Sequence, residues 1–153
     1  MTERRFDSVA DIIAFAIQRE IDAADGYAKI AGLATTPGLR QLADELRRQE
    51  ESHRRLLEEL PVETLRELGT SFIPDLHIVD ALADEKLTND MSIQEMLIFS
   101  VKKEAQAIAL YDSLARLDGA PGHERIFQFL AGQEREHKLK LEAEYERQVL
   151  QEN

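Results

Sequence analysis

Six side chains that could bind metal ions occur in two copies of one pattern along the 153-residue chain. They are Glu20, Glu50 and His53 in the first copy, and Glu104, Glu134 and His137 in the second. Each copy has a lone glutamate and, 30 residues later, a Glu-x-x-His motif whose two side chains share one face of a helix. Carboxylate oxygens and imidazole nitrogens are ligands for iron, manganese and zinc. The pattern therefore predicts a site for two metal ions.

The two copies are part of a longer internal repeat. Residues 15–59 align with residues 99–143 without a gap, and every matched pair is 84 positions apart. Chance rarely places two glutamates and a histidine at three fixed positions, so we interpret the copies as related. The other matches include Phe15 with Phe99, Tyr27 with Tyr111, Pro37-Gly38 with Pro121-Gly122, Gln49 with Gln133 and Leu57 with Leu141. The repeat predicts two helical hairpins of one design, packed about a pseudo-two-fold axis.

Apolar residues recur every three or four positions over four long stretches, which is typical of helices with one buried face. Residues that can cap a helix precede three of these stretches, namely Ser8, Thr36 and Ser92. Glu95 completes a capping box with Ser92. The expected helices extend from about Ser8 to Leu33, Pro37 to Leu60, Ser92 to Leu117 and Pro121 to Val149. The sequence therefore predicts an all-α protein built as a four-helix bundle.

Residues 61–90 separate the two predicted hairpins and contain no clear helical pattern beyond a short helix expected at 61–68. A connection of about 30 residues is much longer than an ordinary turn between two helices. It is long enough to cross the length of the bundle, so that the second hairpin begins at the opposite end. We therefore treat residues 1–153 as one domain with a long crossover between its repeated halves.

The spacing within each hairpin places its glutamates at one height in the bundle. The paths from Glu20 to the turn and from the turn back to Glu50 both rise roughly 21 to 22 Å. If the apolar faces pack inward, all six side chains meet mid-bundle, where four uncompensated carboxylates would repel one another. Two divalent cations would neutralise them. We assign Glu50 and Glu134 as bridging ligands, and one lone glutamate as the terminal ligand of each hairpin's ion.

The composition is that of an acidic protein without cysteine. The net charge of −11 opposes binding to nucleic acid or to anionic membranes. The absence of cysteine excludes disulfides, thiolate catalysis and iron–sulfur clusters. No apolar run approaches the ~20 residues of a membrane span, and the N-terminus has no signal-peptide pattern. We expect a protein of the cytoplasm.

The doubled pattern of a glutamate followed by Glu-x-x-His resembles the ferritin-like superfamily. The 30-residue spacing and a tyrosine seven residues after each lone glutamate are most similar to short rubrerythrin-like proteins without a rubredoxin domain. The resemblance covers about residues 8–145 and implies a di-iron or di-manganese carboxylate site. It also implies reaction with O2 or H2O2.

Two differences from typical rubrerythrins concern the expected activity. Rubrerythrins carry a cysteine-ligated rubredoxin iron that delivers electrons, whereas this chain has no cysteine, so a separate protein would have to donate them. Rubrerythrins also have a further glutamate one turn after the third-helix ligand. Ala107 stands at that position, and Ala23 at its repeat equivalent. The predicted site is therefore a symmetric set of six ligands.

Several residues near the pattern have alternative interpretations. Tyr27 and Tyr111 are either core tyrosines or donors of hydrogen bonds to a ligand carboxylate of the facing hairpin. His77 and His123 are interpreted as surface or loop histidines. Four phenylalanines are assigned to the core, namely Phe15, Phe99, Phe127 and Phe129. The charged side of residues 47–58 is interpreted as a surface of ion pairs.

Three functions are compatible with this site. The first is an oxidoreductase in which two iron ions, or manganese, react with O2 or H2O2, as a ferroxidase or a peroxide-detoxifying enzyme. The second is an iron-binding or storage protein without turnover. The third is a structural bundle whose site is vestigial or holds zinc. We expect a homodimer whose partners are metal ions, the oxidant and a separate electron-donor protein.

Overall fold

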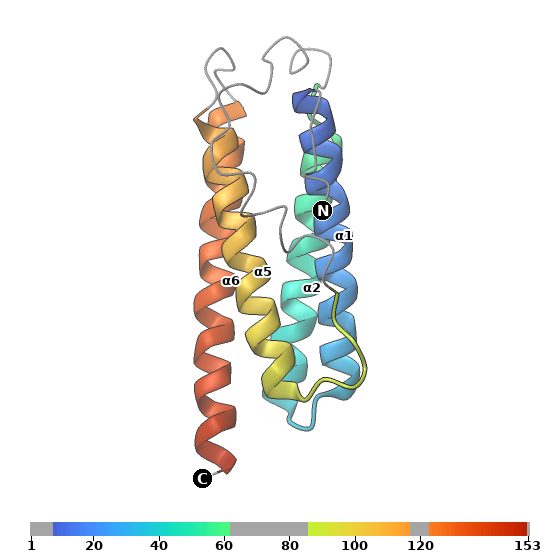
Figure 1. Ribbon diagram of the computed structural model, residues 1–153, viewed down its shortest axis with the longest axis vertical. Coiled ribbons are helices and arrows are strands. Elements are labelled where there is room, and N and C mark those ends of the chain that lie inside the picture. The colour runs from blue at the N-terminus through green and yellow to red at the C-terminus, as the bar shows by residue number, and fades with distance from the viewer. Residues whose placement is uncertain (1–7, 62–85, 117–122, 153) are drawn as a thin grey trace, which may run out of the picture.

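The computed structural model describes residues 8–61, 86–116 and 123–152, and these residues form four long helices and no strand. The helices are α1 (Val9–Leu33), α2 (Pro37–Glu58), α5 (Ile93–Ala115) and α6 (His123–Glu152). Together they form an elongated bundle (Figure 1). The prediction of an all-α four-helix bundle is confirmed for this part of the chain.

The bundle consists of two antiparallel hairpins (Figure 1). Helix α1 packs along α2 and α5 packs along α6, and the hairpins meet where α1 faces α5 and α2 faces α6. Helix α2 ends at one end of the bundle and α5 begins toward the other, as the predicted crossover requires (Figure 1). Residues 62–85, with most of the short helix predicted at 61–68, lie outside the described residues.

Side-chain caps determine where three of the helices begin. The hydroxyl of Ser8 caps α1 at 3.2 Å and that of Thr36 caps α2 at 3.3 Å, each accepting a hydrogen bond from a backbone N–H of the first turn. Ser92 and Glu95 form both bonds of the predicted capping box, each at 3.1 Å. Pro37 occupies the first turn of α2, where a backbone donor is not needed. The predicted N-caps are confirmed, and they satisfy backbone groups that lack a partner within the helix.

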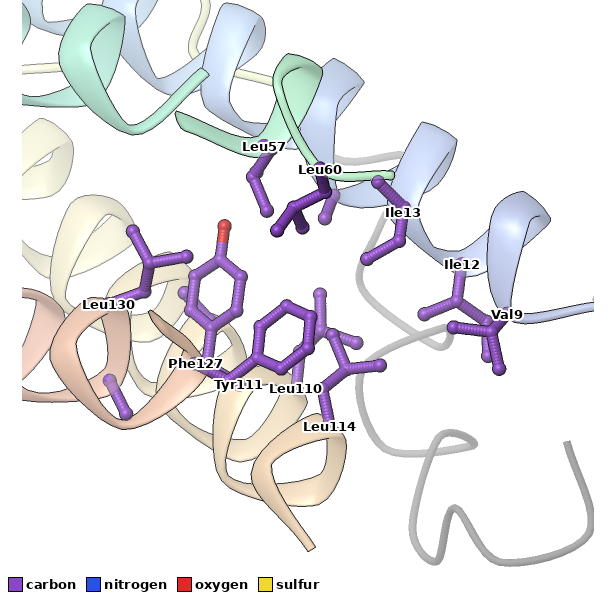
Figure 2. Close-up of a cluster of buried hydrophobic side chains, with 13 residues drawn as sticks. Val9, Ile12, Ile13, Leu57, Leu60, Leu110, Tyr111, Leu114, Phe127 and Leu130 are labelled. Atoms are coloured by element: carbon purple, nitrogen blue, oxygen red, sulfur yellow. The ribbon is translucent and has the colours of Figure 1, made fainter. Parts of the chain in front are cut away.

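Two apolar clusters fill the two ends of the bundle core. The cluster at the end where α1 begins includes the buried residues Ile12, Ile13, Leu57, Leu110 and Phe127 (Figure 2). The cluster toward the turn between α1 and α2 includes the buried residues Ile30, Leu39, Leu46, Met96 and Leu97. The candidate ligands lie between these two groups along every helix. The fold therefore places one polar layer between two apolar ones.

The structure corrects several details of the predicted core. Phe129 is 54% exposed rather than in the core, because it lies two residues from the buried Phe127 and so faces the opposite side of α6. Phe15 and Phe99 are only partly buried and pack against the edges of the two clusters. Helix α6 continues to Glu152, beyond its predicted end. Helical periodicity thus identified the buried face but not every residue on it.

The charged side of α2 is a surface of ion pairs, as predicted. Arg47 lies 3.0 Å from Glu51. Arg54 lies 3.0 Å from Glu58 in the same i, i+4 arrangement. Exposed pairs of this kind contribute little to stability. None of the described helices is long and apolar enough to cross a membrane.

Replacement of the fully buried Leu46 by alanine should lower the free energy of unfolding by about 2–5 kcal/mol, because it removes apolar contacts and leaves a cavity. Leu139→Ala is the matched control, since the Leu139 side chain is 67% exposed. The control should change stability by less than about 0.5 kcal/mol. Urea unfolding followed by circular dichroism measures both variants, and equal losses would contradict the assignment of the core.

Candidate metal centre

The structure brings all six candidate ligands together in the middle of the bundle. They come from four helices, with Glu20 on α1, Glu50 and His53 on α2, Glu104 on α5, and Glu134 and His137 on α6. Their exposed fractions lie between 0% and 3%. They meet at one level because the spacing from the lone glutamate to the turn equals the spacing from the turn to the Glu-x-x-His motif in both hairpins.

The six side chains form two overlapping groups, each with ligand atoms that lie within 4.8 Å of one another. The groups are Glu20, Glu50, His53 and Glu134, and Glu50, Glu104, Glu134 and His137. Glu50 and Glu134 belong to both groups, whereas the glutamate and the histidine that complete each group come from one hairpin. This geometry suits two ions that share two carboxylates.

The imidazole Nδ1 atoms point into the cluster. His53 Nδ1 lies 2.8 Å from Glu134 Oε1 and 3.2 Å from Glu50 Oε1. His137 Nδ1 lies 3.1 Å from Glu50 Oε1. The two rings are stacked, with centroids 5.7 Å apart and planes inclined by 14°. Each of the two groups therefore contains one imidazole nitrogen close to the shared carboxylates.

Many ligand atoms of the cluster have no hydrogen-bond partner among the described residues. These atoms are both side-chain oxygens of Glu50 and of Glu134, Oε2 of Glu20 and of Glu104, and Nδ1 of His53 and of His137. The two imidazoles lie at ion-pair distance from the shared carboxylates, but they can balance at most two of the four negative charges. A buried carboxylate whose charge is not compensated is strongly destabilising, so the cluster requires further cations. A donor set of oxygen with some nitrogen suits iron or manganese. The residues present therefore fit a di-metal centre.

Burial and mutual repulsion shift the pKa values of the carboxyl groups. Loss of hydration raises the pKa of Glu50 well above its ordinary value, and the charges of Glu20 and Glu104 raise it further. Loss of hydration, followed by the charges of Glu104 and Glu50, likewise raises the pKa of Glu134. Burial would also raise the pKa of Glu104, but the adjacent Glu134 and His137 lower it to about 2. Without cations, the shared carboxylates therefore tend to hold protons.

The histidine pKa values are raised, contrary to the usual effect of burial on an imidazole. Burial by itself lowers the pKa of His53, but the neighbouring carboxylates, led by Glu134, raise it to about 12. Burial also opposes the charged form of His137, but Glu104 raises its pKa above the ordinary value. A metal ion that binds at Nδ1 must therefore displace a proton from each imidazole.

Two tyrosine hydroxyls connect the hairpins at the lone glutamates. Tyr111 on α5 donates a hydrogen bond to Glu20 Oε1 on α1 at 2.5 Å. Tyr27 on α1 donates a hydrogen bond to Glu104 Oε1 on α5. The structure therefore supports the interpretation of both tyrosines as hydrogen-bond donors to a glutamate of the facing hairpin. Burial, with the charges of the neighbouring glutamates, raises the pKa of both tyrosines, so both remain donors.

Gln49 contacts the cluster and was not among the residues predicted from the sequence. Its Oε1 atom lies 2.6 Å from His137 Nε2, across the interface between α2 and α6. Because an amide oxygen only accepts hydrogen bonds, Nε2 carries a proton, which leaves Nδ1 to bind a metal. The match between Gln49 and Gln133 in the repeat was the signal that could have identified this residue.

Arg19 is a second residue beside the cluster that the ligand pattern did not predict. It is 7% exposed, and its Nη1 atom lies 3.8 Å from Glu20 Oε1. Its Nη2 atom donates a hydrogen bond to the backbone oxygen of Lys103 at 2.8 Å. Burial by itself lowers the pKa of Arg19, but Glu20 and the other carboxylates raise it, so the guanidinium stays charged. Arg19 lies three residues after the buried Ala16, and this helical spacing could have indicated that its side chain is buried.

Three other residues singled out from the sequence supply no ligand. His123 is the first residue of α6 and is partly buried rather than exposed, and it belongs to neither metal-binding group. Ala107 is fully buried, and Ala23 is partly buried beside a pocket between α1 and α5. His77 lies outside the described residues. The cluster thus contains six candidate ligands within the described part of the chain.

Gln49→Leu should weaken metal binding about 10- to 100-fold, because it removes the acceptor that holds the His137 ring. Competition with a chelator of known affinity for Mn(II) measures the change. Gln128→Leu is the matched control, since Gln128 is exposed on α6 and bonds to Glu124. Equal affinities in the Gln49→Leu variant and the parent protein would contradict the positioning role.

Metal binding at neutral pH should release protons, and the affinity should rise with pH. The pKa values of both histidines and of Glu50 and Glu134 are raised, so these groups hold protons at neutral pH. The metal must displace these protons, and fewer of them remain as the pH rises. Titration calorimetry in two buffers with different ionisation enthalpies measures the number of protons released. Tighter binding at lower pH would show that these groups are not protonated as inferred.

One solved structure with a similar fold is the crystal structure of a protein from Thermotoga maritima that is described as a ferritin-like diiron-carboxylate protein. The TM-score is 0.69 and the identity is 20%, and the match covers 94% of this chain and 98% of that chain. At this identity, the likeness shows the ferritin-like fold. No curated protein matches the chain.

The family comparison extends over most of the chain. The model of the rubrerythrin family matches residues 11–145. This range contains all six candidate ligands, both tyrosines that bond to them, and Gln49. The chain therefore belongs to the rubrerythrin family.

Proposed function

We propose that the protein is a non-haem di-iron carboxylate oxidoreductase that reacts with O2 or H2O2, in a ferroxidase or peroxide-detoxifying role. The observation that carries this proposal is the group of buried ligand atoms at the centre of the bundle that have no hydrogen-bond partner among the described residues. Two divalent cations would balance the charge of the four carboxylates. The description of the Thermotoga protein as a diiron-carboxylate protein favours iron.

In this proposal Glu50 and Glu134 bridge the two ions, since both belong to each metal-binding group. A lone glutamate and a histidine from one hairpin complete the protein ligands of each ion. When bound, a ferrous pair supplies two electrons for reduction of the oxidant. Manganese suits the same donor set, and zinc competes for it because of its high affinity for such ligands.

The surrounding residues hold the ligands in a defined geometry. Tyr27 and Tyr111 each bond to one oxygen of a lone glutamate, which leaves the other oxygen for a metal ion. Gln49 holds the His137 ring with Nδ1 directed at the shared carboxylates. The apolar clusters on both sides bury the polar layer along the bundle axis, which strengthens electrostatic interactions within it.

Repeated turnover requires a source of electrons. The chain contains no cysteine, so it cannot hold a cysteine-ligated iron centre of its own. We therefore propose that a separate electron-donor protein reduces the centre during peroxide detoxification. In the ferroxidase role, ferrous iron is itself the electron source and the substrate.

Anaerobic loading with Fe(II), followed by O2 or H2O2, should produce Fe(III) absorbance faster than free iron does in the same buffer. Glu50→Ala should abolish this acceleration, because it removes a ligand that both metal-binding groups share. Glu51→Ala is the matched control, since the Glu51 side chain is 38% exposed and pairs with Arg47 on the surface. Stopped-flow absorbance compares the three proteins.

Two results would contradict the proposal in different ways. Stoichiometric iron binding without faster oxidation would exclude the oxidoreductase and favour an iron-binding or storage protein. A melting temperature that is the same with Fe(II) and with a chelator would exclude binding itself, because a ligand that binds the folded state must stabilise it. That second result would favour a structural bundle.

A further inference from the structure

A pocket of about 490 Å³ opens between α1 and α5 beside the cluster. Tyr27 and Glu104, which are hydrogen-bonded to each other, are among its lining residues. Its volume lies within the ~300–1,000 Å³ that is typical of small-molecule sites, and it far exceeds the ~30 Å³ of one water molecule. O2 and H2O2 are little larger than water. The pocket therefore has room for an organic molecule and is much larger than these oxidants require.

The pocket carries more positive than negative side chains, although the whole chain has a net charge of −11. Its charged lining residues are the cations Arg19, Lys29, Lys86 and Lys103 and the anions Asp22, Asp25 and Glu104. Lys29 and Lys86 are exposed, whereas Arg19 is buried. Asp25 is exposed as well, so the cations near solvent are partly balanced. The buried end holds Arg19 beside Glu104, and once a metal ion balances Glu104 this end favours an anionic ligand.

Arg19 retains hydrogen-bond donors that no described residue uses. Its Nη2 atom bonds to the backbone of Lys103, but Nε and Nη1 have no hydrogen-bond partner among the described residues. If two divalent ions neutralise the four carboxylates, as in the proposed function, the guanidinium has no remaining counterion in the cluster. A buried charge without a counterion is strongly destabilising. An anion in the pocket would supply that counterion.

The internal repeat loses its symmetry at this pocket. Gly26 lines the pocket, whereas its repeat equivalent Leu110 is fully buried in an apolar cluster. A Cβ atom at Gly26 would lie 3.0 Å from Leu87 Cδ1, so the glycine allows Leu87 to approach and form part of the wall. The pocket therefore lies beside Gly26 in one half of the repeat, whereas apolar side chains fill the equivalent region beside Leu110.

We propose that this pocket binds a small organic monocarboxylate, with its carboxylate at Arg19 and its apolar body against Leu87 and Phe99. A guanidinium pairs well with a planar carboxylate, and one buried cation balances one negative charge rather than the two of a phosphate. The pocket also places the ligand beside Glu104, so it is a candidate substrate of the metal centre. This last role rests on the proposed function, whereas the pocket and its lining do not.

Calorimetric titration of the full chain with octanoate, acetate and octanol tests the proposal. The protein is used metal-free and loaded with Zn(II), and its Zn(II) content is measured first. Octanoate should bind the Zn(II)-loaded protein saturably and more tightly than acetate or octanol, because only octanoate has both the charge and the apolar chain. Its binding should weaken in the metal-free protein, where the carboxylates of the cluster compete for Arg19.

Arg19→Gln should weaken octanoate binding about 10- to 100-fold, because it removes charge-assisted hydrogen bonds. Ala23→Leu should also weaken it, since Ala23 lines the pocket and a larger side chain fills the space without removing a charge. Lys102→Gln is the matched control, because Lys102 is exposed on α5 and is not a lining residue. The variants are compared at equal Zn(II) content.

Unchanged octanoate affinity in both Arg19→Gln and Ala23→Leu would overturn the proposal, and so would equal affinities for octanoate and octanol. Absence of octanoate binding to protein with its full Zn(II) content would overturn the pocket proposal and leave the di-metal centre intact. A protein that binds octanoate but no metal would support the pocket and contradict the proposed function.

Discussion

Four carboxylates and two imidazoles lie buried in one layer of the core, and the rest of the structure depends on how their charge is compensated. Burial and the neighbouring charges raise the pKa values of Glu50 and Glu134, so these two carboxylates resist ionisation without a cation. The apolar clusters on either side keep the layer closed, and they also make any uncompensated charge more destabilising. Ions bound at this site, as proposed, would couple metal binding to folding of the bundle.

The polar layer also determines how the two hairpins are placed relative to each other. The closest helix packing lies within each hairpin, whereas the hydrogen bonds around the cluster cross between hairpins. Tyr27 and Tyr111 each reach a glutamate of the facing hairpin, and both shared carboxylates belong to each metal-binding group. The site therefore contributes to the pairing of the hairpins as well as to the proposed chemistry.

The duplication explains the symmetry of the ligands but not the whole surroundings of the site. The lone glutamates, the tyrosines and the Glu-x-x-His motifs are repeated, and the two hydrogen bonds between a tyrosine and a lone glutamate are equivalent. The region on one side of the cluster is filled by apolar side chains such as Leu110, while the equivalent region at Gly26 contains a pocket with a buried arginine. Because the pocket lies on one side only, the two metal-binding groups have different surroundings.

The amino-acid sequence by itself determined the fold class, the starts of α1, α2 and α5, and the six candidate ligands. These depend on local properties, namely helical periodicity, capping residues and a spacing that sets the height of each side chain along the bundle. Only the tertiary structure decided between the two interpretations of Tyr27 and Tyr111, and only it revealed Gln49 and Arg19 beside the cluster. The physical reason is that these contacts depend on which helices face each other and how each is rotated about its axis. Packing of the whole bundle sets both, and residue spacing within one helix does not.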